Sequence, residues 1–324
     1  MTSQQARAFW VEAPGQGAIR DEVLPMPSAS DVVVRTRYSG ISRGTESLVF
    51  SGRVPDSEQQ RMRAPFQEGT FPAPVKYGYC NVGEVESGPE ALVGRTVFSL
   101  YPHQTRFVVP ASAVHVLPEH LPAGRAVLAA NMETAVNGVW DAAIQPGDRV
   151  TVVGAGAVGC LVAWLAGHIP GTEVCLVDIN PERAPVASRL GVGFALPADA
   201  PAERDVVVHA SGAPGGLGLA LSLAAFEATI VEMSWFGAQA VSLPLGEAFH
   251  AKRLAIRASQ VGHVAASHRA RWDYGRRMRF AISLLCDPVL DTLITGESAF
   301  DALPGVMRDL STGVLDALCH RIRY

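Results

Sequence analysis

The first hundred residues consist of short apolar runs separated by turns that contain glycine and proline. The runs lie at 31–37, 83–86, 96–100 and 106–109. Many short β-type runs with such turns predict a barrel-like β domain. The pattern changes around 118–124, and from Arg125 onward apolar residues recur at helical spacing.

Beyond this point, strand-length apolar runs alternate with helical segments. The runs lie at 149–154, 174–178, 205–210, 228–234 and 254–260. This alternation predicts a parallel sheet. The helix after the second run is marked by Asn180 as N-cap, Pro181 at the first helical position and Gly191 past the end. Two later helices are expected at 272–286 and 301–310.

These patterns predict an α/β protein of two domains, as expected for a chain of 324 residues. We expect a doubly wound, Rossmann-type parallel sheet over 120–266. The second domain takes 1–119 and 267–324. Its last segment includes a basic cluster that we expect on a solvated helix face, with Arg269, Arg271, Arg276, Arg277 and Arg279.

Composition and charge narrow the class of function. Hydrophobic residues make up 48% and charged residues 18%, and the formal net charge is −4. No basic surface is therefore expected for nucleic acid or acidic lipid. The apolar run 151–167 is too short and too rich in glycine for a membrane span. Five cysteines without a CxxC pair, and a polar start to the chain, favour a cytoplasmic protein without structural zinc.

A glycine motif follows the first strand of the predicted parallel sheet and leads into a helix. Gly154, Gly156 and Gly159 form GxGxxG in the context typical of dinucleotide binding. The first glycine permits a tight turn, the second lets the backbone approach a pyrophosphate, and the third allows close packing of helix on strand. The loop and the helix N-terminus are expected to hold the pyrophosphate with Gly154, Ala155, Gly156, Ala157, Val158 and Gly159.

Residues at the ends of the later strands complete the predicted cofactor site. Asp178 ends the second strand, where a carboxylate accepts hydrogen bonds from ribose hydroxyls and repels a 2′-phosphate, so NAD is favoured over NADP. Arg183 instead favours use of NADP, because a basic residue at this position can hold the 2′-phosphate. The further expected contacts are Ile179, Ala210, Ser211, Gly212 and Ser234.

Five segments resemble the medium-chain dehydrogenase/reductase superfamily, which includes zinc alcohol dehydrogenases and quinone reductases. They are GISRGTE at 40–46, GYCNVGEV at 78–85, NMETA at 131–135, PGDRV at 146–150 and VHASG at 208–212. The segments 42–46 and 101–104 are most similar to the bacteriochlorophyllide a dehydrogenase branch. The resemblance implies that the second domain is a GroES-like catalytic domain.

The chain departs from this family at the zinc ligands. Zinc-using relatives carry ligands at positions that here hold Ser42 or Arg43, Tyr79 and Ala130. The resemblance therefore implies that the catalytic zinc is absent, and the segment expected to carry a four-cysteine structural zinc site has no cysteine. A relocated metal site that uses Cys80, His103 and Glu46 is the alternative.

Without zinc, side chains must stabilise the substrate oxygen and exchange its proton. The resemblance brings together the candidates Ser42, Glu46, Tyr79, His103, Glu133 and Thr134. Tyr79 can donate a hydrogen bond, and His103 can carry a proton. Glu46 is alternatively a positioning residue, and Thr134 is alternatively a cap at the start of a helix.

Three functions fit these features. The first is an NAD(H)-dependent alcohol or carbonyl oxidoreductase without zinc. The second is an enoyl or quinone reductase, and the third is a non-catalytic NAD(H)-binding sensor. The partner expected in each case is a small molecule. The strand at 254–260 is the last of the cofactor domain, so we expect it at a sheet edge that joins two subunits in a homodimer.

Overall fold

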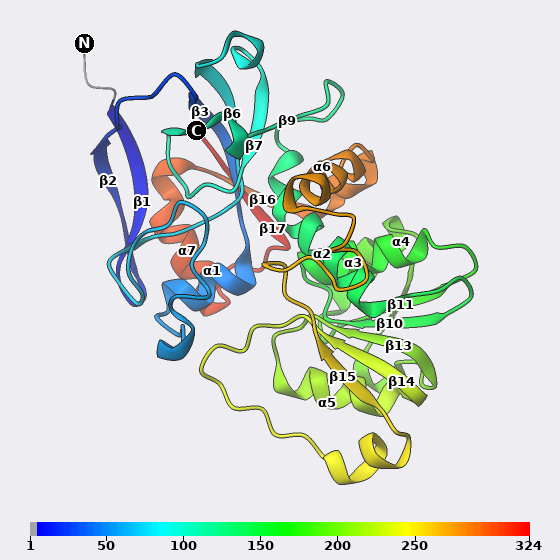
Figure 1. Ribbon diagram of the computed structural model, residues 1–324. Coiled ribbons are helices and arrows are strands. Elements are labelled where there is room, and N and C mark those ends of the chain that lie inside the picture. Colours follow the sequence, from blue (N-terminus) through cyan, green and yellow to red (C-terminus); the bar gives the residue numbers. More distant parts are fainter. Residues whose placement is uncertain (1–4) are drawn as a thin grey trace. The chain divides into compact units, whose positions relative to one another are not determined.

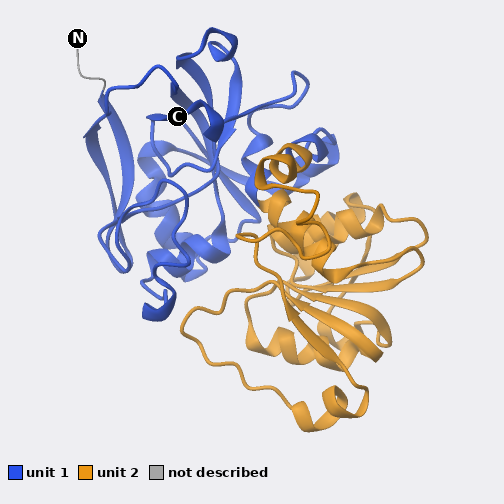
Figure 2. Ribbon diagram, in the orientation of Figure 1, with its two compact units in different colours: residues 1–130, 282–324 blue, residues 131–281 orange. Residues whose placement is uncertain are grey.

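The computed structural model describes residues 5–324 and divides into two compact units. Unit 1 contains 1–130 and 282–324, and unit 2 contains 131–281 (Figure 2). Both classes of sheet expected from the sequence are present, so the α/β class is confirmed. The functional domain boundaries at 119/120 and 266/267 stay a prediction.

Unit 1 contains two mainly antiparallel sheets. The first has the order β2-β1-β5-β4, and the second has the order β16-β17-β3-β6-β7-β9, with β8 paired to β3. The strands are β1 (Gln5–Ala13), β2 (Gln16–Val23), β3 (Asp31–Ile41), β4 (Glu68–Gly69), β5 (Val75–Lys76), β6 (Asn81–Ser87), β7 (Thr96–Ser99), β8 (Arg106–Pro110), β9 (His115–Val116), β16 (Ile294–Ala299) and β17 (Cys319–Arg323).

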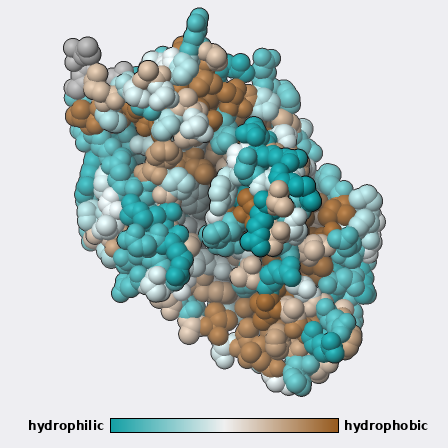
Figure 3. Space-filling model, in the orientation of Figure 1, coloured by the Kyte–Doolittle hydropathy of each residue, from teal (hydrophilic) through white to brown (hydrophobic). Residues whose placement is uncertain are grey.

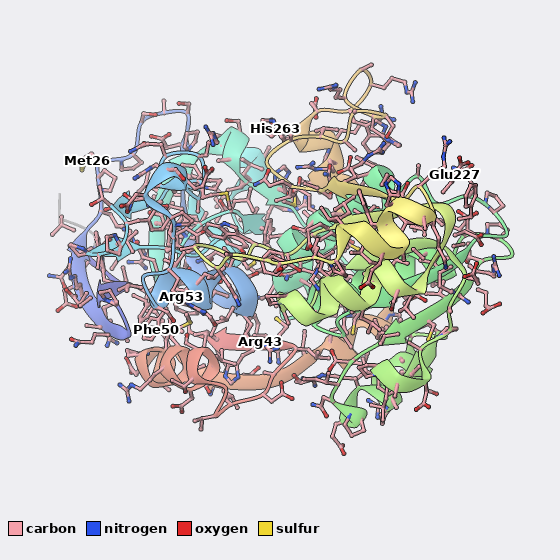
Figure 4. All side chains as sticks on the ribbon, turned by 90° about the horizontal axis from the view of Figure 1, so that it is seen from below. Met26, Arg43, Phe50, Arg53, Glu227 and His263 are labelled. Carbon is pink, nitrogen blue, oxygen red and sulfur yellow. The ribbon has the colours of Figure 1, made fainter. Side chains whose placement is uncertain are left out.

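Two α-helices and several 3₁₀ turns complete unit 1. Helix α1 (Arg43–Phe50), whose first and last residues are labelled in Figure 4, follows β3 directly. Helix α7 (Leu303–Thr312) packs against α1 and β2 and ends at Gly313, which has a left-handed φ of 78°. The 3₁₀ turns are η1 (Asp56–Glu58), η2 (Glu90–Leu92), η3 (Ala111–Ala113), η4 (Ala126–Leu128), η8 (Pro288–Leu293) and η9 (Phe300–Ala302).

The core of unit 1 lies among β3, β6, β7 and β8. Val32, Val34 and Val97 belong to one buried cluster there. Val33, between the first two, is also fully buried, on the opposite face of β3. Tyr101 stacks on Phe107 with ring centroids 4.0 Å apart. The strands predicted in this region are all present, although each begins or ends within a few residues of the expected position.

Unit 2 contains a parallel sheet of the order β12-β11-β10-β13-β14-β15. Its strands are β10 (Arg149–Val153), β11 (Glu173–Val177), β12 (Gly193–Ala195), β13 (Arg204–His209), β14 (Ala224–Glu232) and β15 (Ala255–Ala258). The order reverses beside β10, which is the doubly wound topology predicted from the sequence. The short strand β12 adds to the five expected.

The helices of unit 2 cover the sheet. Helices α3 and α4 lie on one side of the strands in Figure 1, and α5 lies on the other. The elements are α2 (Ala129–Ala142), α3 (Ala157–Gly167), η5 (Pro181–Arg183), α4 (Ala184–Arg189), η6 (Pro197–Asp199), α5 (Pro214–Leu223), η7 (Leu245–Phe249) and α6 (Tyr274–Leu284). Helix α2 begins two residues before unit 2, and α6 ends three residues after it.

The helix signals after β11 are confirmed. The Asn180 side chain accepts a hydrogen bond from the backbone N–H of Glu182 at 3.0 Å, and Pro181 opens the helical turn. Gly191 follows α4 with a φ of 74°, a conformation that favours glycine. These contacts fix where the chain leaves the end of β11.

Strand β15 lies at one edge of the six-stranded sheet, as predicted. All four of its side chains are exposed, and Ile256 retains 37% of its accessible surface. Its cross-strand neighbour Ile230 on β14 is fully buried. No helix among residues 5–324 is both long and apolar enough to cross a membrane.

Candidate functional site

The glycine motif of unit 2 forms the turn between β10 and α3. Gly154 has a φ of 110°, and a Cβ added there would lie 2.5 Å from the backbone nitrogen of Ser211. A Cβ at Gly159 would lie 1.9 Å from the carbonyl oxygen of Gly154. Gly156 differs, because a Cβ there would meet nothing within 4 Å. Two of the glycines therefore serve packing, while Gly156 leaves room for another molecule.

Helix α3 starts directly from this turn. Gly156 is its N-cap residue, and no side chain caps the helix. The backbone N–H groups of the first turn, including those of Ala157 and Val158, are therefore not occupied by a capping side chain. The N-terminus of such a helix attracts anions, because its free N–H groups and the positive end of the helix dipole face the same side.

Asp178 connects this turn to the end of β11. Its Oδ2 accepts a hydrogen bond from the Ala155 N–H at 2.7 Å, and its Oδ1 accepts one from the Asn180 N–H at 2.9 Å. Each carboxylate oxygen has a second lone pair for a ligand hydroxyl. Ile179 is 84% exposed beside it, and Arg183 is half-buried on the turn that follows.

The ends of β13 and β14 hold a network around His209. The residues Ala210, Ser211 and Gly212 follow β13, and Ser234 follows β14, as predicted. Sequence reasoning missed His209 and Glu232, which end these strands and contact each other at 2.7 Å. The only signal in the sequence was a histidine at the end of an otherwise apolar strand.

In unit 1, four of the predicted catalytic residues come together in one buried cluster. Glu46 Oε2 lies 2.8 Å from His103 Nε2, and both side chains are almost fully buried. Glu46 Oε1 accepts a hydrogen bond from the Ser42 N–H at 2.8 Å. Helix α1 supplies Ser42 and Glu46 from one turn, because Ser42 is its N-cap residue.

Tyr79 is the fourth member of this cluster. Its hydroxyl hydrogen-bonds to the side chains of Ser42 and Thr45. Burial, with the nearby Cys80 and Glu46, raises the pKa of the Tyr79 phenol well above its usual value, so the hydroxyl stays protonated near neutral pH. The tyrosine side chain keeps part of its surface accessible. It is therefore the member of the cluster that can reach a ligand.

The cluster extends through residues that the sequence did not identify. Ser39 Oγ lies 2.7 Å from His103 Nδ1 and 2.9 Å from the hydroxyl of Tyr324. Both imidazole nitrogens of His103 therefore have partners. Ser39 is 285 positions from Tyr324, and β17 brings the two together by pairing with β3. No local pattern could have indicated this contact.

Glu133 and Thr134 lie on α2 in unit 2. The Glu133 carboxylate pairs with the Arg277 guanidinium at 3.1 Å, and both side chains are buried. Burial raises the pKa of Glu133, and Arg277 partly offsets this effect. Thr134 is the sixth residue of α2, so the alternative that it caps the helix start is wrong.

The prediction that Arg277 lies on a solvated helix face was also wrong. Its side chain is 2% exposed and donates hydrogen bonds to Asn137 Oδ1 at 2.6 Å and to the Val261 carbonyl oxygen. The other arginines of that cluster are exposed, namely Arg269, Arg271, Arg276 and Arg279. Arg269 and Arg271 precede α6, so only three of the five lie on this helix. Nothing in the sequence indicated that one of these three turns inward to a carboxylate on α2.

Metal ligands are not grouped in the described part of the chain. Among residues 5–324, no three His, Cys, Asp or Glu side chains lie close enough together to hold a metal ion. The nitrogens of His103 are occupied by Glu46 and Ser39. Cys80 is buried, and burial and the nearby Glu46 carboxylate raise the pKa of its thiol. This donor set is unlike the three-ligand, one-open-position arrangement of a catalytic zinc.

Comparison with known proteins identifies relatives of this fold. No family model matches the chain. A D-guloside 3-dehydrogenase of Escherichia coli (strain K12) is 25% identical over 303 residues, which covers 82% of this chain and 86% of the relative.

Two solved structures extend the likeness to the whole chain. The L-idonate 5-dehydrogenase of Escherichia coli superimposes with a TM-score of 0.82 at 16% identity, covering 100% of this chain and 99% of that one. A short chain alcohol dehydrogenase of Escherichia coli CFT073, in complex with NADH, gives a TM-score of 0.76 at 20% identity, with full coverage of both chains.

The buried pair of Glu133 and Arg277 generates a prediction about stability. In Arg277→Met, the Glu133 carboxylate stays buried without its cationic partner, so we expect a loss of about 3–5 kcal/mol in the free energy of unfolding at pH 8. Because a buried carboxyl with a raised pKa is stabilised by protonation, the loss should shrink at pH 5. Urea denaturation measures both values.

The matched control is Arg279→Met on the exposed part of α6, which should change stability by less than about 0.5 kcal/mol. The double variant Arg277→Met with Glu133→Leu should recover much of the loss. Equal stability of Arg277→Met and wild type at pH 8 would contradict the assigned role.

Proposed function

We propose that the chain is an alcohol dehydrogenase-like, NAD(P)-dependent oxidoreductase of the medium-chain dehydrogenase/reductase superfamily, as its similarity to a D-guloside 3-dehydrogenase supports. We further propose that it exchanges a hydride between NAD(H) and an alcohol or carbonyl substrate without a catalytic zinc. The observation that carries this proposal is the buried cluster of Glu46, His103, Ser42 and Tyr79 in unit 1. It contains both a proton-exchanging pair and a hydrogen-bond donor.

We propose a reaction without zinc because of the side chains that stand where zinc-using relatives have their ligands. Two of the three positions that match zinc ligands of relatives hold Tyr79 and Ala130, and the third holds Ser42 or Arg43. Neither of the alternative ligands His103 and Glu46 is open, since they are bound to each other. These residues do not fit a catalytic zinc, so no step of the proposed reaction passes through a metal. The similarity to the bacteriochlorophyllide a dehydrogenase branch stays a prediction.

Unit 2 supplies the residues that would hold the cofactor. The loop at Gly156 and the first turn of α3 would bind the pyrophosphate, and the Asp178 carboxylate would accept hydrogen bonds from the adenosine ribose. When bound, the nicotinamide accepts or supplies the hydride. The open space at Gly156 supports this assignment, since a Cβ there would meet nothing within 4 Å.

Unit 1 supplies the groups that handle the proton. A substrate hydroxyl must lose a proton as its carbon loses a hydride, and a carbonyl must gain one in the reverse direction. Tyr79 stays protonated and donates a hydrogen bond to the substrate oxygen. Ser42 bonds to Tyr79 through its side chain and to Glu46 through its backbone N–H, so it places the phenol beside the Glu46–His103 pair. Because a backbone N–H does not relay a proton, we assign to this pair a direct exchange of the proton with the substrate oxygen.

The relatives suggest which alcohols to test. One acts as a D-guloside 3-dehydrogenase and another as an L-idonate 5-dehydrogenase, so both are named for secondary hydroxyls of sugar derivatives. We therefore infer that a secondary alcohol of a sugar or polyol, or the corresponding ketone, is the best first class of substrate.

The test is an activity panel on the purified protein with its metal content measured. Polyols, glycosides, keto-sugars, enones and quinones are assayed with NAD(H) and NADP(H), with and without chelator. We expect turnover of a secondary alcohol or ketone, zinc well below one equivalent, and activity that survives chelation. Stoichiometric zinc with loss of activity in chelator would overturn the zinc-free reaction. Turnover of enones or quinones alone would favour the reductase alternative.

The role of Tyr79 is tested in the same assay. Tyr79→Phe removes the hydrogen-bond donor to the substrate oxygen, so kcat/KM should fall by about a hundredfold or more, the usual range for loss of such a donor. The control Tyr274→Phe removes a hydroxyl that binds only the Gly262 carbonyl oxygen, and it should leave kcat/KM unchanged. Thermal unfolding of both variants checks that they are folded.

A second prediction concerns the choice between NAD(H) and NADP(H). Asp178→Ser removes the carboxylate that repels a 2′-phosphate, so the ratio of the Kd for NADPH to that for NADH should fall by about tenfold. The control is Asp205→Asn at the opposite end of the sheet, where Asp205 pairs with the exposed Arg149. Equal affinity of the wild type for both cofactors, unchanged in Asp178→Ser, would count against this role.

We further propose a homodimer formed through β15. The strand has one unpaired edge, and its side chains are exposed. Figure 3 shows apolar residues gathered over β15 and α5. A two-fold axis at this edge would let β15 pair with its copy and continue the sheet, which is an isologous contact.

The dimer is tested with a charge at the edge. Ile256→Glu should convert a dimer to a monomer in sedimentation velocity, because a carboxylate would be buried against its own copy. Val314→Glu, at a residue 79% exposed in unit 1, is the control and should stay dimeric. A wild-type protein that is monomeric from low to high micromolar concentration would rule out this interface.

A further inference from the structure

A buried charged pair lies under the ends of β13 and β14 in unit 2, and the proposed reaction does not use it. His209 is fully buried, and its Nδ1 lies 2.7 Å from Glu232 Oε2. Its Nε2 lies 2.6 Å from Ser211 Oγ. The Glu232 side chain is 12% exposed, whereas Ser211 is exposed. The chain of contacts thus runs from a buried carboxylate to a hydroxyl at the surface.

The network is held in one arrangement by the surrounding backbone. Glu232 Oε1 accepts a hydrogen bond from the Ser234 N–H at 2.6 Å, and Ser234 Oγ accepts one from the Gly212 N–H at 3.0 Å. A Cβ at Gly216 on α5 would lie 2.4 Å from Ser211 Oγ. The glycine therefore leaves the space that the serine hydroxyl occupies.

The hydrogen-bond partners determine the direction of each bond. A carboxylate only accepts, so the proton of neutral His209 is on Nδ1 and is donated to Glu232. Nε2 must then accept, and Ser211 donates its hydroxyl proton inward. Ser211 Oγ accepts a hydrogen bond from the Ala213 N–H at 3.2 Å and keeps one lone pair for a ligand. The surface there presents an acceptor oxygen, backed by a pair with a net charge of about −1.

Serine, histidine and a carboxylate also form the nucleophile, base and orienting acid of acyl-transfer enzymes. The site lacks a second feature that those enzymes need. Such chemistry needs free N–H donors for an oxyanion. The nearest amides are occupied, since Gly212 N–H donates to Ser234 Oγ and Ala213 N–H donates to Ser211 Oγ at 3.2 Å. The arrangement suits recognition of a ligand rather than nucleophilic attack.

The strand order indicates which part of a dinucleotide lies over this network. In doubly wound sheets the two mononucleotide halves of the ligand lie over the two halves of the sheet, on either side of the point where the order reverses. Asp178 belongs to the half formed by β10, β11 and β12. His209 and Glu232 end β13 and β14, which belong to the other half, so their network lies under the nicotinamide half.

We propose that the Glu232–His209–Ser211 network makes this site selective for the oxidised, cationic nicotinamide. The NAD+ ring carries a positive charge that the NADH ring lacks, so a net negative pair strengthens the binding of NAD+ relative to NADH. The inference rests on the proposed binding of NAD(H) and adds a determinant of redox-state specificity. A unit charge within about 10 Å in a partly screened site changes such a preference on the order of tenfold.

The test compares three ligands on Glu232→Gln, which keeps the shape and removes the charge. Kd values for NAD+, NADH and ADP-ribose are measured by calorimetry at pH 8. The Kd for NAD+ should rise about tenfold, and those for NADH and ADP-ribose should change less than about threefold. The matched control is Glu227→Gln on the same strand (Glu227 is labelled in Figure 4). Its exposed carboxylate pairs with Arg253, and the substitution should change none of the three Kd values.

The ADP-ribose measurement also reports whether the variant is folded. ADP-ribose lacks the nicotinamide, so its Kd in Glu232→Gln should stay near that of the wild type.

The outcomes separate this inference from the proposed function. Equal losses for NAD+ and NADH in Glu232→Gln would overturn the inference while NAD(H) binding stands. Failure of all three ligands to bind the wild type would overturn the proposed function, and the inference with it. A selective loss for NAD+ in Glu232→Gln, absent in Glu227→Gln, supports the inference.

Discussion

The cofactor half of the molecule depends on the close approach of α3 to β10. The Gly154 carbonyl oxygen lies where a Cβ at Gly159 would be, so only glycine allows the helix to start this near the strand. The same turn is tied to the end of β11, because the Gly154 N–H donates to the Val177 carbonyl oxygen and the Ala155 N–H donates to Asp178. The end of β13 is held beside it, because the Ala210 N–H donates to the Val153 carbonyl oxygen at the end of β10. The approach therefore positions the acidic end of β11, the uncapped helix start and the end of β13 around one turn.

Buried carboxylates in both units follow one electrostatic rule. Glu46 is paired with His103, Glu232 with His209, and Glu133 with Arg277. A carboxylate taken out of water costs several kcal/mol unless a partner and hydrogen bonds offset the loss. The partners differ in chemistry, however. Arginine stays charged and fixes α2 to α6, whereas a histidine partner can gain or lose a proton, which suits groups that act in chemistry or recognition.

The two units thus carry different parts of the proposed reaction. Unit 2 contributes phosphate-binding backbone and a charged network under the strand ends, and unit 1 contributes the cluster around Tyr79. In the proposed reaction, the cluster around Tyr79 does the work without a metal. A protonated phenol beside a carboxylate–imidazole pair offers a hydrogen-bond donor and a proton-exchanging group.

The sequence alone determined what depends on residues that are near one another along the chain. The strand-to-helix turn at Gly154, the cap at Asn180 and the alternation of the parallel strands all follow from backbone geometry over a few residues. The resemblance to a known family then identified candidate catalytic residues, but it did not show which side chains they hydrogen-bond to.

Only the tertiary structure decided which polar side chains meet. Glu46 and His103 are 57 positions apart, and Arg277 is 144 positions from Glu133. Arg277 looked like its exposed neighbours because a sequence pattern reports which face of a helix a residue occupies, not which carboxylate another helix brings against it. A charged side chain is buried only where folding brings an oppositely charged or hydrogen-bonding partner against it, because that partner offsets the cost of desolvation. The sequence pattern does not show such long-range partners.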